Sequence, residues 1–194
     1  MLPESLNVFD FDGTLVKVNS FRVITKRFSA MLIKKFKIGS FLTLITWYIL
    51  RRIGIISHLK FKQRVVDIFE KSLTEEEKRS ICQKMFDDNV NEAVFERLVN
   101  FDNCIICTAS PFSYVSRVSF NKDVTIISSL DTENHLPDIA NSGPAKVENL
   151  KAYFKGKDIH VANFFTDNSI DDQAIIDLSA KAFVVEGDRV RKVK

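Results

Sequence analysis

The sequence predicts an α/β protein whose mainly parallel sheet has helices on both faces, with a mainly helical domain inserted into it. After residue 101, short apolar runs alternate with amphipathic segments, as they do where helices join parallel strands. Another apolar run lies near the N-terminus, and residues 19–100, which have helical character, separate it from the others. A chain of 194 residues, 45% hydrophobic and 27% charged, is long enough to bury such a core.

The first strand is expected at residues 6–11, where an apolar run meets acids and glycine. In the insertion, residues 65–73 and 91–99 repeat apolar side chains at intervals of three and four, which predicts helices. Thr74 and the three glutamates after it are typical of an N-cap with acids in the first turn. The insertion is therefore expected to be mainly helical.

The second half of the chain alternates strands with helices. Strands are expected at 104–109, 124–129, 160–166 and 182–187, and helices at 112–119, 146–154 and 171–180. Residues 1–16 and 101–194 are expected to form the sheet-containing core, and residues 17–100 the helical insertion. In such sheets the active site lies at the carboxyl ends of the strands.

Two aspartates, Asp10 and Asp12, end the first predicted strand and are followed at once by Gly13 and Thr14. Burying carboxylates is costly unless a cation or hydrogen bonds compensate, so the pair indicates chemistry. Such carboxylates can attack an electrophile, exchange protons or bind a metal ion. The alternative is a loop of solvated acids that follows a strand.

Other polar side chains follow the later strands. Thr108 and Ser110 end the second strand, Lys146 begins a later helix, and Asp167 and Asp171 follow the fourth strand. If these strands are neighbours, one sheet edge holds hydroxyls, a cation for an anionic oxygen and acids for a hard divalent metal.

In this order the motifs resemble those of the haloacid dehalogenase superfamily of phosphohydrolases. DFDGT, a strand ending in Thr or Ser, a lysine and a strand ending in D-x-x-x-D follow one another across the whole chain. The resemblance implies a Rossmann-like three-layer core, with residues 17–100 as a helical cap between the first two motifs. That position resembles the subgroup of phosphoserine phosphatase and, more weakly, phosphatidylglycerophosphate phosphatase-like members.

The resemblance implies a Mg²⁺-dependent phosphomonoester hydrolase. Asp10 matches the nucleophile that becomes an aspartyl-phosphate, and Asp12 the general acid/base that protonates the leaving alcohol and activates water. Thr108 matches the hydroxyl that binds the transferring phosphoryl group, and Lys146 the cation that holds phosphate beside the nucleophile. Haloalkanoate dehalogenation does not need the second aspartate, so Asp12 favours phosphate ester chemistry.

The resemblance also implies the metal ligands. These are Asp10, the backbone carbonyl of Asp12, and Asp167, with Asp171 supporting the Mg²⁺ directly or through water. Oxygen ligands of this kind suit a hard divalent cation.

Three positions leave alternatives open. Thr166, before Asp167, stands where the family often has glycine, which predicts a different turn. Ser110 is a further candidate for phosphate binding, as an extra contact or in place of Thr108. Asp172 is interpreted as an acid at the N-terminus of the following helix.

Charge is distributed unevenly along the chain. Residues 17–64 contain twelve Lys or Arg and no Asp or Glu, although the net charge is only +3. The thirteen residues 38–50 carry no charge and lie between bases within 34–52. A bilayer-crossing helix needs roughly 18 to 20 residues, but shorter apolar helices flanked by bases bind anionic membrane surfaces. Either 34–52 makes peripheral contact with an anionic membrane, or its apolar residues pack within the cap.

The favoured substrate is an amphiphilic or lipid-linked phosphate, and the alternative is a small soluble ester such as a phosphoamino acid or sugar phosphate. A phosphotransferase or mutase with the same nucleophile would use the same residues. The basic segment alone does not indicate a specific nucleic-acid partner, and no pattern indicates an oligomeric state. Three cysteines and an N-terminus unlike a signal peptide predict a cytoplasmic protein, peripheral at the membrane if 34–52 binds lipid.

Overall fold

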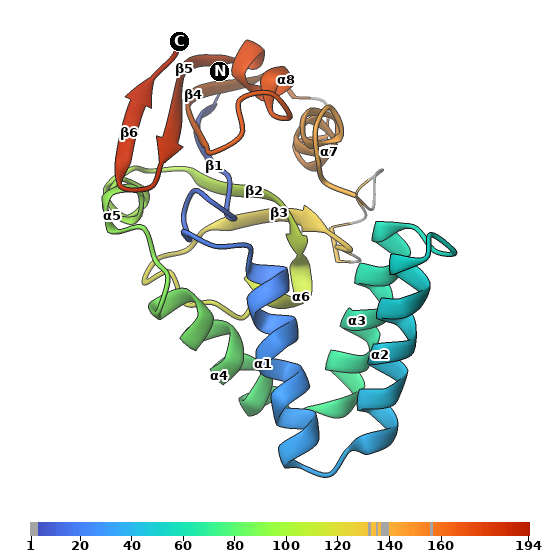
Figure 1. Ribbon diagram of the computed structural model, residues 1–194. Coiled ribbons are helices and arrows are strands. Elements are labelled where there is room, and N and C mark those ends of the chain that lie inside the picture. Colours follow the sequence, from blue (N-terminus) through green and yellow to red (C-terminus); the bar gives the residue numbers. More distant parts are fainter. Residues whose placement is uncertain (1–3, 132, 135, 137–139, 156) are drawn as a thin grey trace.

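A computed structural model describes residues 4–131, 133, 134, 136, 140–155 and 157–194 (Figure 1). One six-stranded sheet has the strand order β3-β2-β1-β4-β5-β6. Its strands are β1 (Glu4–Phe9), β2 (Cys104–Pro111), β3 (Thr125–Ser129), β4 (Ile159–Thr166), β5 (Ser179–Glu186) and β6 (Arg189–Lys192). Strands β1 to β5 are parallel, and β6 pairs antiparallel with β5. The predicted α/β class with a mainly parallel sheet is confirmed.

Helices cover both faces of the sheet. On one face, α7 (Ala145–Tyr153) and α8 (Gln173–Leu178) bury Leu150 and Ile175 in an apolar cluster with strand residues. On the other, α5 (Glu92–Asn100) buries Val94 and Leu98 in a second cluster. The short helix α6 (Phe112–Val115) follows β2. The result is a three-layer core in which β1 lies near the middle of the sheet.

Four helices lie between β1 and α5: α1 (Ser20–Lys34), α2 (Ile38–Arg52), α3 (His58–Ser72) and α4 (Glu75–Asp87). Thr74 caps α4 as the sequence predicted, and Glu77 completes a capping box with it. Figure 1 shows α1, α2 and α3 extending away from the sheet as long, roughly antiparallel rods. Residues 19–100 are thus mainly helical, as expected.

The chain rejoins the sheet before residue 100. Val16 forms an isolated bridge with Val90, and the Asn91 side chain donates a hydrogen bond to the Gly187 carbonyl at 2.7 Å. Because α5 is amphipathic and buries its apolar side against the sheet, it belongs with the core layers. The residues expected to form the helical insertion thus include one helix, α5, that packs on the sheet.

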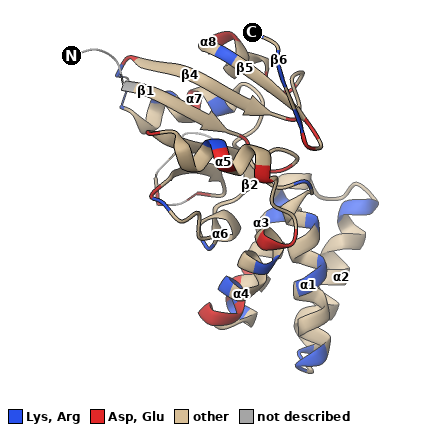
Figure 2. Cartoon of the chain, turned by 90° about the vertical axis from the view of Figure 1, so that its left-hand side faces the viewer, with Lys and Arg blue, Asp and Glu red and all other residues tan. Residues whose placement is uncertain are grey.

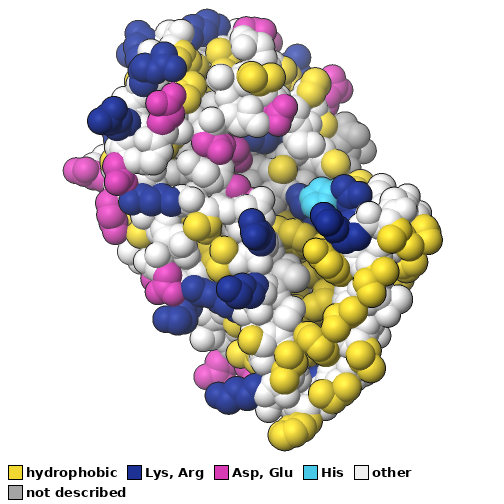
Figure 3. Space-filling view, in the orientation of Figure 1, with side chains coloured by type: hydrophobic (Ala, Val, Ile, Leu, Met, Phe, Trp, Pro, Cys, Tyr) yellow, Lys and Arg dark blue, Asp and Glu magenta, His cyan; other side chains and the backbone are white. Residues whose placement is uncertain are grey.

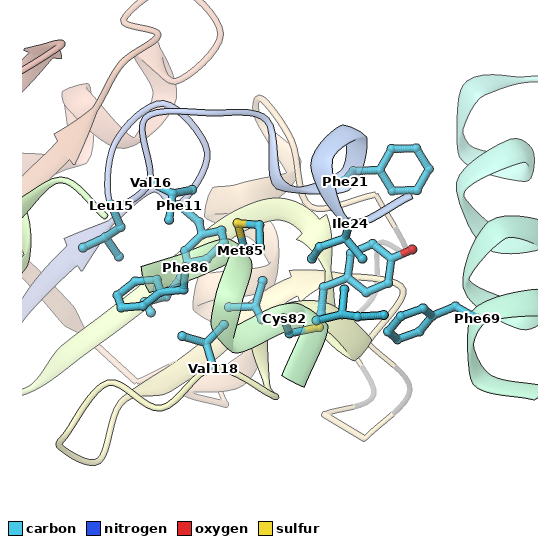
Figure 4. Packing of buried hydrophobic residues seen from close by; sticks show 14 of the residues in the cluster. Phe11, Leu15, Val16, Phe21, Ile24, Phe69, Cys82, Met85, Phe86 and Val118 are labelled. Atoms are coloured by element: carbon cyan, nitrogen blue, oxygen red, sulfur yellow. The ribbon is translucent and has the colours of Figure 1, made fainter. Parts of the chain in front are cut away.

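The loop after β1 is anchored by apolar side chains. Phe11, Leu15 and Val16 are fully buried and point toward Met85 and Phe86 of α4 (Figure 4). This cluster continues into α1 and α3, so the inserted helices share one apolar core with a face of the sheet. Tight packing of this kind holds the loop, and with it the two aspartates that flank Phe11, in one position.

Candidate active site

Asp10 follows β1 directly and is almost fully buried. Its backbone N–H donates to the Phe165 carbonyl of β4 at 2.9 Å, which continues the sheet pairing by one residue. Oδ1 accepts a hydrogen bond from the Phe11 N–H at 2.8 Å, and Oδ2 lies 3.3 Å from Nζ of Lys146. The carboxylate is therefore oriented by the backbone on one side and by a cation on the other.

Lys146 is the second residue of α7, where the positive end of a helix disfavours a cation. It is nevertheless buried, with 3% of its surface exposed. Asp172 compensates: its two carboxylate oxygens lie 2.8 and 2.9 Å from Nζ. The Thr166 hydroxyl in turn donates to Oδ2 of Asp172 at 2.7 Å. Three elements thus fix the ammonium group beside Asp10.

The protonation of this pair follows from its surroundings. Burial raises the pKa of Asp10 to about 7, although Lys146 opposes the shift, and repulsion from Asp172 and Asp12 adds to it. Burial alone would lower the pKa of Lys146, but Asp10 and Asp172 more than offset this and raise it. Lys146 therefore remains a cation, whereas Asp10 needs more positive charge nearby to stay ionised at neutral pH.

Asp12 is held by hydrogen bonds from two elements. The Ser20 N–H, at the start of α1, donates to Oδ1 at 2.9 Å, and the Ser110 hydroxyl of β2 donates to Oδ2 at 2.8 Å. Ser20 and Ser110 lie 2.7 Å apart, Oγ to Oγ. Since Ser110 has one hydroxyl proton and gives it to Asp12, Ser20 is the donor to Ser110.

Thr108 lies within β2 and is buried, with 1% of its surface exposed. Its Oγ1 accepts a hydrogen bond from the Ser110 N–H at 3.1 Å. Asn141 fixes the strand by donating through Nδ2 to the carbonyls of Thr108, at 3.0 Å, and Ile127, at 2.8 Å. Thr108 and Ser110 thus lie at the same edge of the sheet as Asp10 and Asp12, and Ser110 is hydrogen-bonded to Asp12.

Asp167 follows β4 and approaches the loop after β1 at Gly13. A Cβ on Gly13 would lie 2.1 Å from Oδ2 of Asp167, and the backbone there has φ +73°. Loss of hydration in this crowded place raises the pKa of Asp167, and repulsion from Asp172 and Asp12 adds to the shift. The absence of a side chain at Gly13 is what lets this carboxylate sit against the loop.

Replacing Gly13 with alanine is expected to destabilise the protein by about 2 kcal/mol or more and to reduce activity, because the new methyl displaces Asp167 and the φ angle is strained. The matched control is Gly54→Ala, since Gly54 has φ +80° but nothing within 4 Å of a Cβ. Urea unfolding and phosphate release measure both effects. Equal losses in the two variants would show that the contact with Asp167 is unimportant.

The two adjacent aspartates before α8 differ sharply. Asp171 is exposed and accepts a hydrogen bond from Nδ2 of Asn168 at 2.7 Å. Asp172 is buried and, although it is the N-cap residue of α8, its side chain makes no capping hydrogen bond. Asp172 is thus the acid at the N-terminus of the following helix, as expected, but its carboxylate pairs with Lys146 instead of capping the helix.

Replacing Asp172 with asparagine is expected to destabilise the protein by about 3 kcal/mol, because it removes a buried charge that partners Lys146. Asp171→Asn, the neighbouring control, is expected to change stability by less than about 0.5 kcal/mol, as exposed substitutions usually do. Chemical denaturation of both variants measures the difference. Equal stabilities would contradict the ion pair with Lys146.

One cation near the site was not distinguished by the sequence. Lys62 of α3 donates through Nζ to the Ala109 carbonyl at 2.9 Å and lies 5.7 Å from the Phe21 ring centroid. Burial lowers the pKa of Lys62, and the charge of Asp12 partly opposes this. Residues 17–64 contain twelve bases, and the sequence does not distinguish Lys62 from the others. Its contact with β2 is visible only in the tertiary structure.

The donor set suits a hard divalent cation. Asp10, Asp12, Asp167 and Asp172 place four carboxylates at this edge, and Lys146 forms ion pairs with Asp10 and Asp172. The space that Gly13 leaves open brings Asp167 toward the first loop. Within the described ranges, however, no three His, Cys, Asp or Glu side chains form a metal-binding group. A cation here would need backbone or water oxygens as well.

A model of the haloacid dehalogenase-like hydrolase family matches residues 8–174. The chain belongs to this family. The match includes every motif residue described above, from Asp10 to Asp172. No curated protein matches the chain.

Two solved structures share the fold of this haloacid dehalogenase-like hydrolase. A protein of unknown function from Bordetella pertussis Tohama I is 13% identical, with TM-score 0.63, over 93% of this chain and 89% of that chain. A phosphoserine phosphohydrolase-like protein from Francisella tularensis subsp. tularensis SCHU S4 is 17% identical, with TM-score 0.50, over 92% and 86%. At these identities the likeness shows the Rossmann-like fold.

Proposed function

We propose that this protein is a Mg²⁺-dependent phosphomonoesterase that works through an aspartyl-phosphate on Asp10. The observation that carries the proposal is the different setting of its two aspartates. Asp10 lies against the Lys146 ammonium, whereas Asp12 accepts hydrogen bonds from Ser20 and Ser110. Two carboxylates in different environments are suited to different roles in one reaction.

In the first step Asp10 attacks phosphorus, and the bond to the ester oxygen breaks. Asp12 gives its proton to the departing alcohol, so no free alkoxide forms. In the second step Asp12 takes a proton from water, which attacks the phosphorus and releases inorganic phosphate and Asp10. Lys146 and the Thr108 hydroxyl are placed to bind phosphoryl oxygens, and Lys146 reduces the repulsion between the anionic nucleophile and the anionic ester.

Asp10, Asp167 and the backbone carbonyl of Asp12 are the proposed Mg²⁺ ligands, with Asp171 supporting them directly or through water. When bound, the ion would neutralise phosphoryl charge and keep Asp10 ionised. This fits the need of Asp10 for more positive charge, since its pKa is raised to about 7.

The apparent affinity for Mg²⁺ is expected to fall by up to about tenfold when the pH is lowered from 7 to 6. Below a pKa of about 7 a proton occupies Asp10, and the cation has to displace it. Between pH 8 and 9 the affinity should be nearly constant. Calorimetric Mg²⁺ titrations measure this, with Asp10→Asn as the variant that loses the dependence. A constant affinity in wild type from pH 6 to 8 would contradict it.

The substrate we favour is amphiphilic or lipid-linked, and a small soluble phosphate ester is the alternative. Lys62, beside the end of β2, is placed to receive a second anionic group of either substrate. The name of the Francisella tularensis neighbour supports phosphatase chemistry on a small ester. A phosphotransferase would use the same residues, with an acceptor alcohol in place of water.

A phosphate-release screen with and without Mg²⁺ tests the proposed function. It should include phosphoamino acids, sugar phosphates and phosphorylated lipids in mixed micelles, each repeated in excess chelator. The proposal expects release from at least one class, abolished by chelation and restored by Mg²⁺. Release that persists in excess chelator would contradict the proposed mechanism.

A further inference from the structure

We infer that the outer side of α2 docks on an anionic lipid surface. The α2 face, as we define it, consists of Ile38, Leu42, Ile45, Ile49 and Ile53. The further step, that docking presents an amphiphilic phosphate to Asp10, rests on the proposed function. Docking itself does not depend on catalysis.

The α2 face is exposed and continuous. Its residues recur at intervals of four, three, four and four, which places them along one side of the helix. Their exposed fractions range from 37% at Ile45 to 63% at Ile53. Figure 3 shows hydrophobic side chains running along α2 and down to the turn that joins it to α1. A continuous apolar surface of this kind on a folded protein marks an interaction site.

The helix is apolar on its packed side as well. Leu44 is buried in α2, and Phe41, Trp47 and Leu50 pack against the apolar cluster. A helix that has apolar residues on both sides does not have the polar outer side of an ordinary surface helix. The outer side of α2 therefore lacks the partner that its composition requires.

The two threonines of α2 are satisfied within the helix. The Thr43 hydroxyl donates to the Gly39 carbonyl at 2.9 Å, and the Thr46 hydroxyl donates to the Leu42 carbonyl at 3.0 Å. Hydroxyls bonded to their own backbone do not need water as an acceptor. The two threonine hydroxyls can therefore enter an apolar medium without being left unpaired.

Charge favours an anionic lipid surface over a second copy of the chain. No Asp or Glu occurs in residues 17–64, and Figure 2 shows bases but no acids on α1 and α2, whereas α4 carries both. Lys34 near one end of the α2 face and Arg52 near the other are both exposed. A second copy would bring the same bases together, whereas anionic headgroups complement them.

Length indicates that α2 lies along the surface. Its 15 residues span about 22 Å, less than the roughly 30 Å of a hydrocarbon core. In the part of the chain that the structure describes, no helix is long and apolar enough to cross a membrane. An apolar stripe with bases at its ends is the pattern of helices that bind in the interface plane.

The C-terminal end of α2 leads toward the active site. Burial lowers the pKa of His58, the first residue of α3, and the positive charges of Lys62 and Arg51 lower it further. Lys62 reaches the Ala109 carbonyl, between Thr108 and Ser110. Lys62 therefore brings a cation of α3, the helix that follows α2, to the proposed phosphate-binding edge of the sheet, as an amphiphilic phosphate would require.

Flotation with vesicles tests the docking. The probes are vesicles of phosphatidylcholine alone and of phosphatidylcholine with about 30% phosphatidylglycerol, whose anionic surface attracts Lys and Arg. Wild type and Asp10→Asn are expected to float with the anionic vesicles alone, less so as salt is raised. The double variant Ile45→Asp/Ile49→Asp is expected to bind at least about tenfold more weakly.

The matched control is Val99→Asp/Val193→Asp, which introduces the same two charges at apolar residues that are 42% and 40% exposed, away from α2. This variant should float like wild type, and circular dichroism should show that all variants are folded. Failure of wild type to bind anionic vesicles would overturn the inference. The inference would also be overturned if the double variant bound anionic vesicles as tightly as wild type. It would likewise be overturned if wild type bound no vesicles but formed a dimer, and the double variant were a monomer.

Activity separates docking from the proposed function. With soluble p-nitrophenyl phosphate the double variant should match wild type, whereas release from a phosphorylated lipid in anionic vesicles should fall with binding. Vesicle binding without any phosphatase activity would leave docking standing and contradict the proposed function instead. Equal activity of both proteins on the vesicle-bound lipid would overturn the link between docking and substrate.

Discussion

Asp10→Asn is expected to reduce phosphate release by about 10⁴-fold or more, because an amide cannot attack phosphorus. The substitution keeps the size of the side chain and its acceptor for the Phe11 N–H. Stability should be equal or higher, since burial already disfavours the charge and raises the pKa of Asp10 to about 7. Loss of activity without loss of stability would separate a nucleophile from a structural residue.

The control for this variant is Asp188→Asn, because that side chain is 76% exposed and lies outside the site. It should retain wild-type activity. Single-turnover assays with ³²P-labelled substrate should label wild type on an acid-stable, hydroxylamine-sensitive bond and leave Asp10→Asn unlabelled. Labelling of the variant to the same extent would place the nucleophile at another residue.

The strands could be predicted because their apolar runs are long enough to be recognised. All five predicted strands are present, with ends shifted by up to three residues. The sixth, β6, was missed because Arg189–Lys192 has one apolar residue and lies exposed at the sheet edge. The expected helix at 112–119 is shorter and ends at Val115. Val118 and Phe120, which follow it, are buried in the apolar cluster, and the sequence did not show these tertiary contacts.

The sequence predicted which strand ends lie together at one edge of the sheet. It did not predict the hydrogen bonds and ion pairs that join the side chains there. Asp171 and Asp172 are adjacent and chemically identical, so spacing alone did not show which one meets Lys146. The residue that could have distinguished them is Thr166, which stands where the family often has glycine. Its hydroxyl donates a hydrogen bond to Asp172 and so orients that carboxylate. Ser20 had no motif of its own, and only the position of α1 against β2 brings it to Ser110.

The inserted helices illustrate the same limit. Sequence showed that residues 17–64 are basic and partly apolar, but burial depends on which side of each helix meets the core. Leu44 faces inward while Ile45 and Ile49 remain exposed. Likewise, α5 carries a helical pattern similar to that of α3, yet packs on the sheet. A helical pattern alone therefore does not show against which layer a helix packs.

Asp12→Asn is expected to slow release of phosphate from an alkyl ester by about 10³-fold, since an amide cannot protonate the alkoxide. With p-nitrophenyl phosphate the first step should be much less affected, because nitrophenolate leaves without a proton. The control is Ser110→Ala, which removes one hydrogen bond to Asp12 but keeps the carboxyl group, and its loss should be smaller. Similar losses on both esters would contradict the role of Asp12 as proton donor.

The same variant distinguishes the two steps of the reaction. If Asp12 also activates water, Asp12→Asn should release a burst of about one equivalent of p-nitrophenol per enzyme and then nearly stop, with phosphate retained on Asp10. Wild type should show steady release of inorganic phosphate, even when alcohols are added. If added alcohols instead capture most of the phosphoryl group from wild type, the enzyme is a phosphotransferase, because the same intermediate then passes to a hydroxyl that binds in place of water.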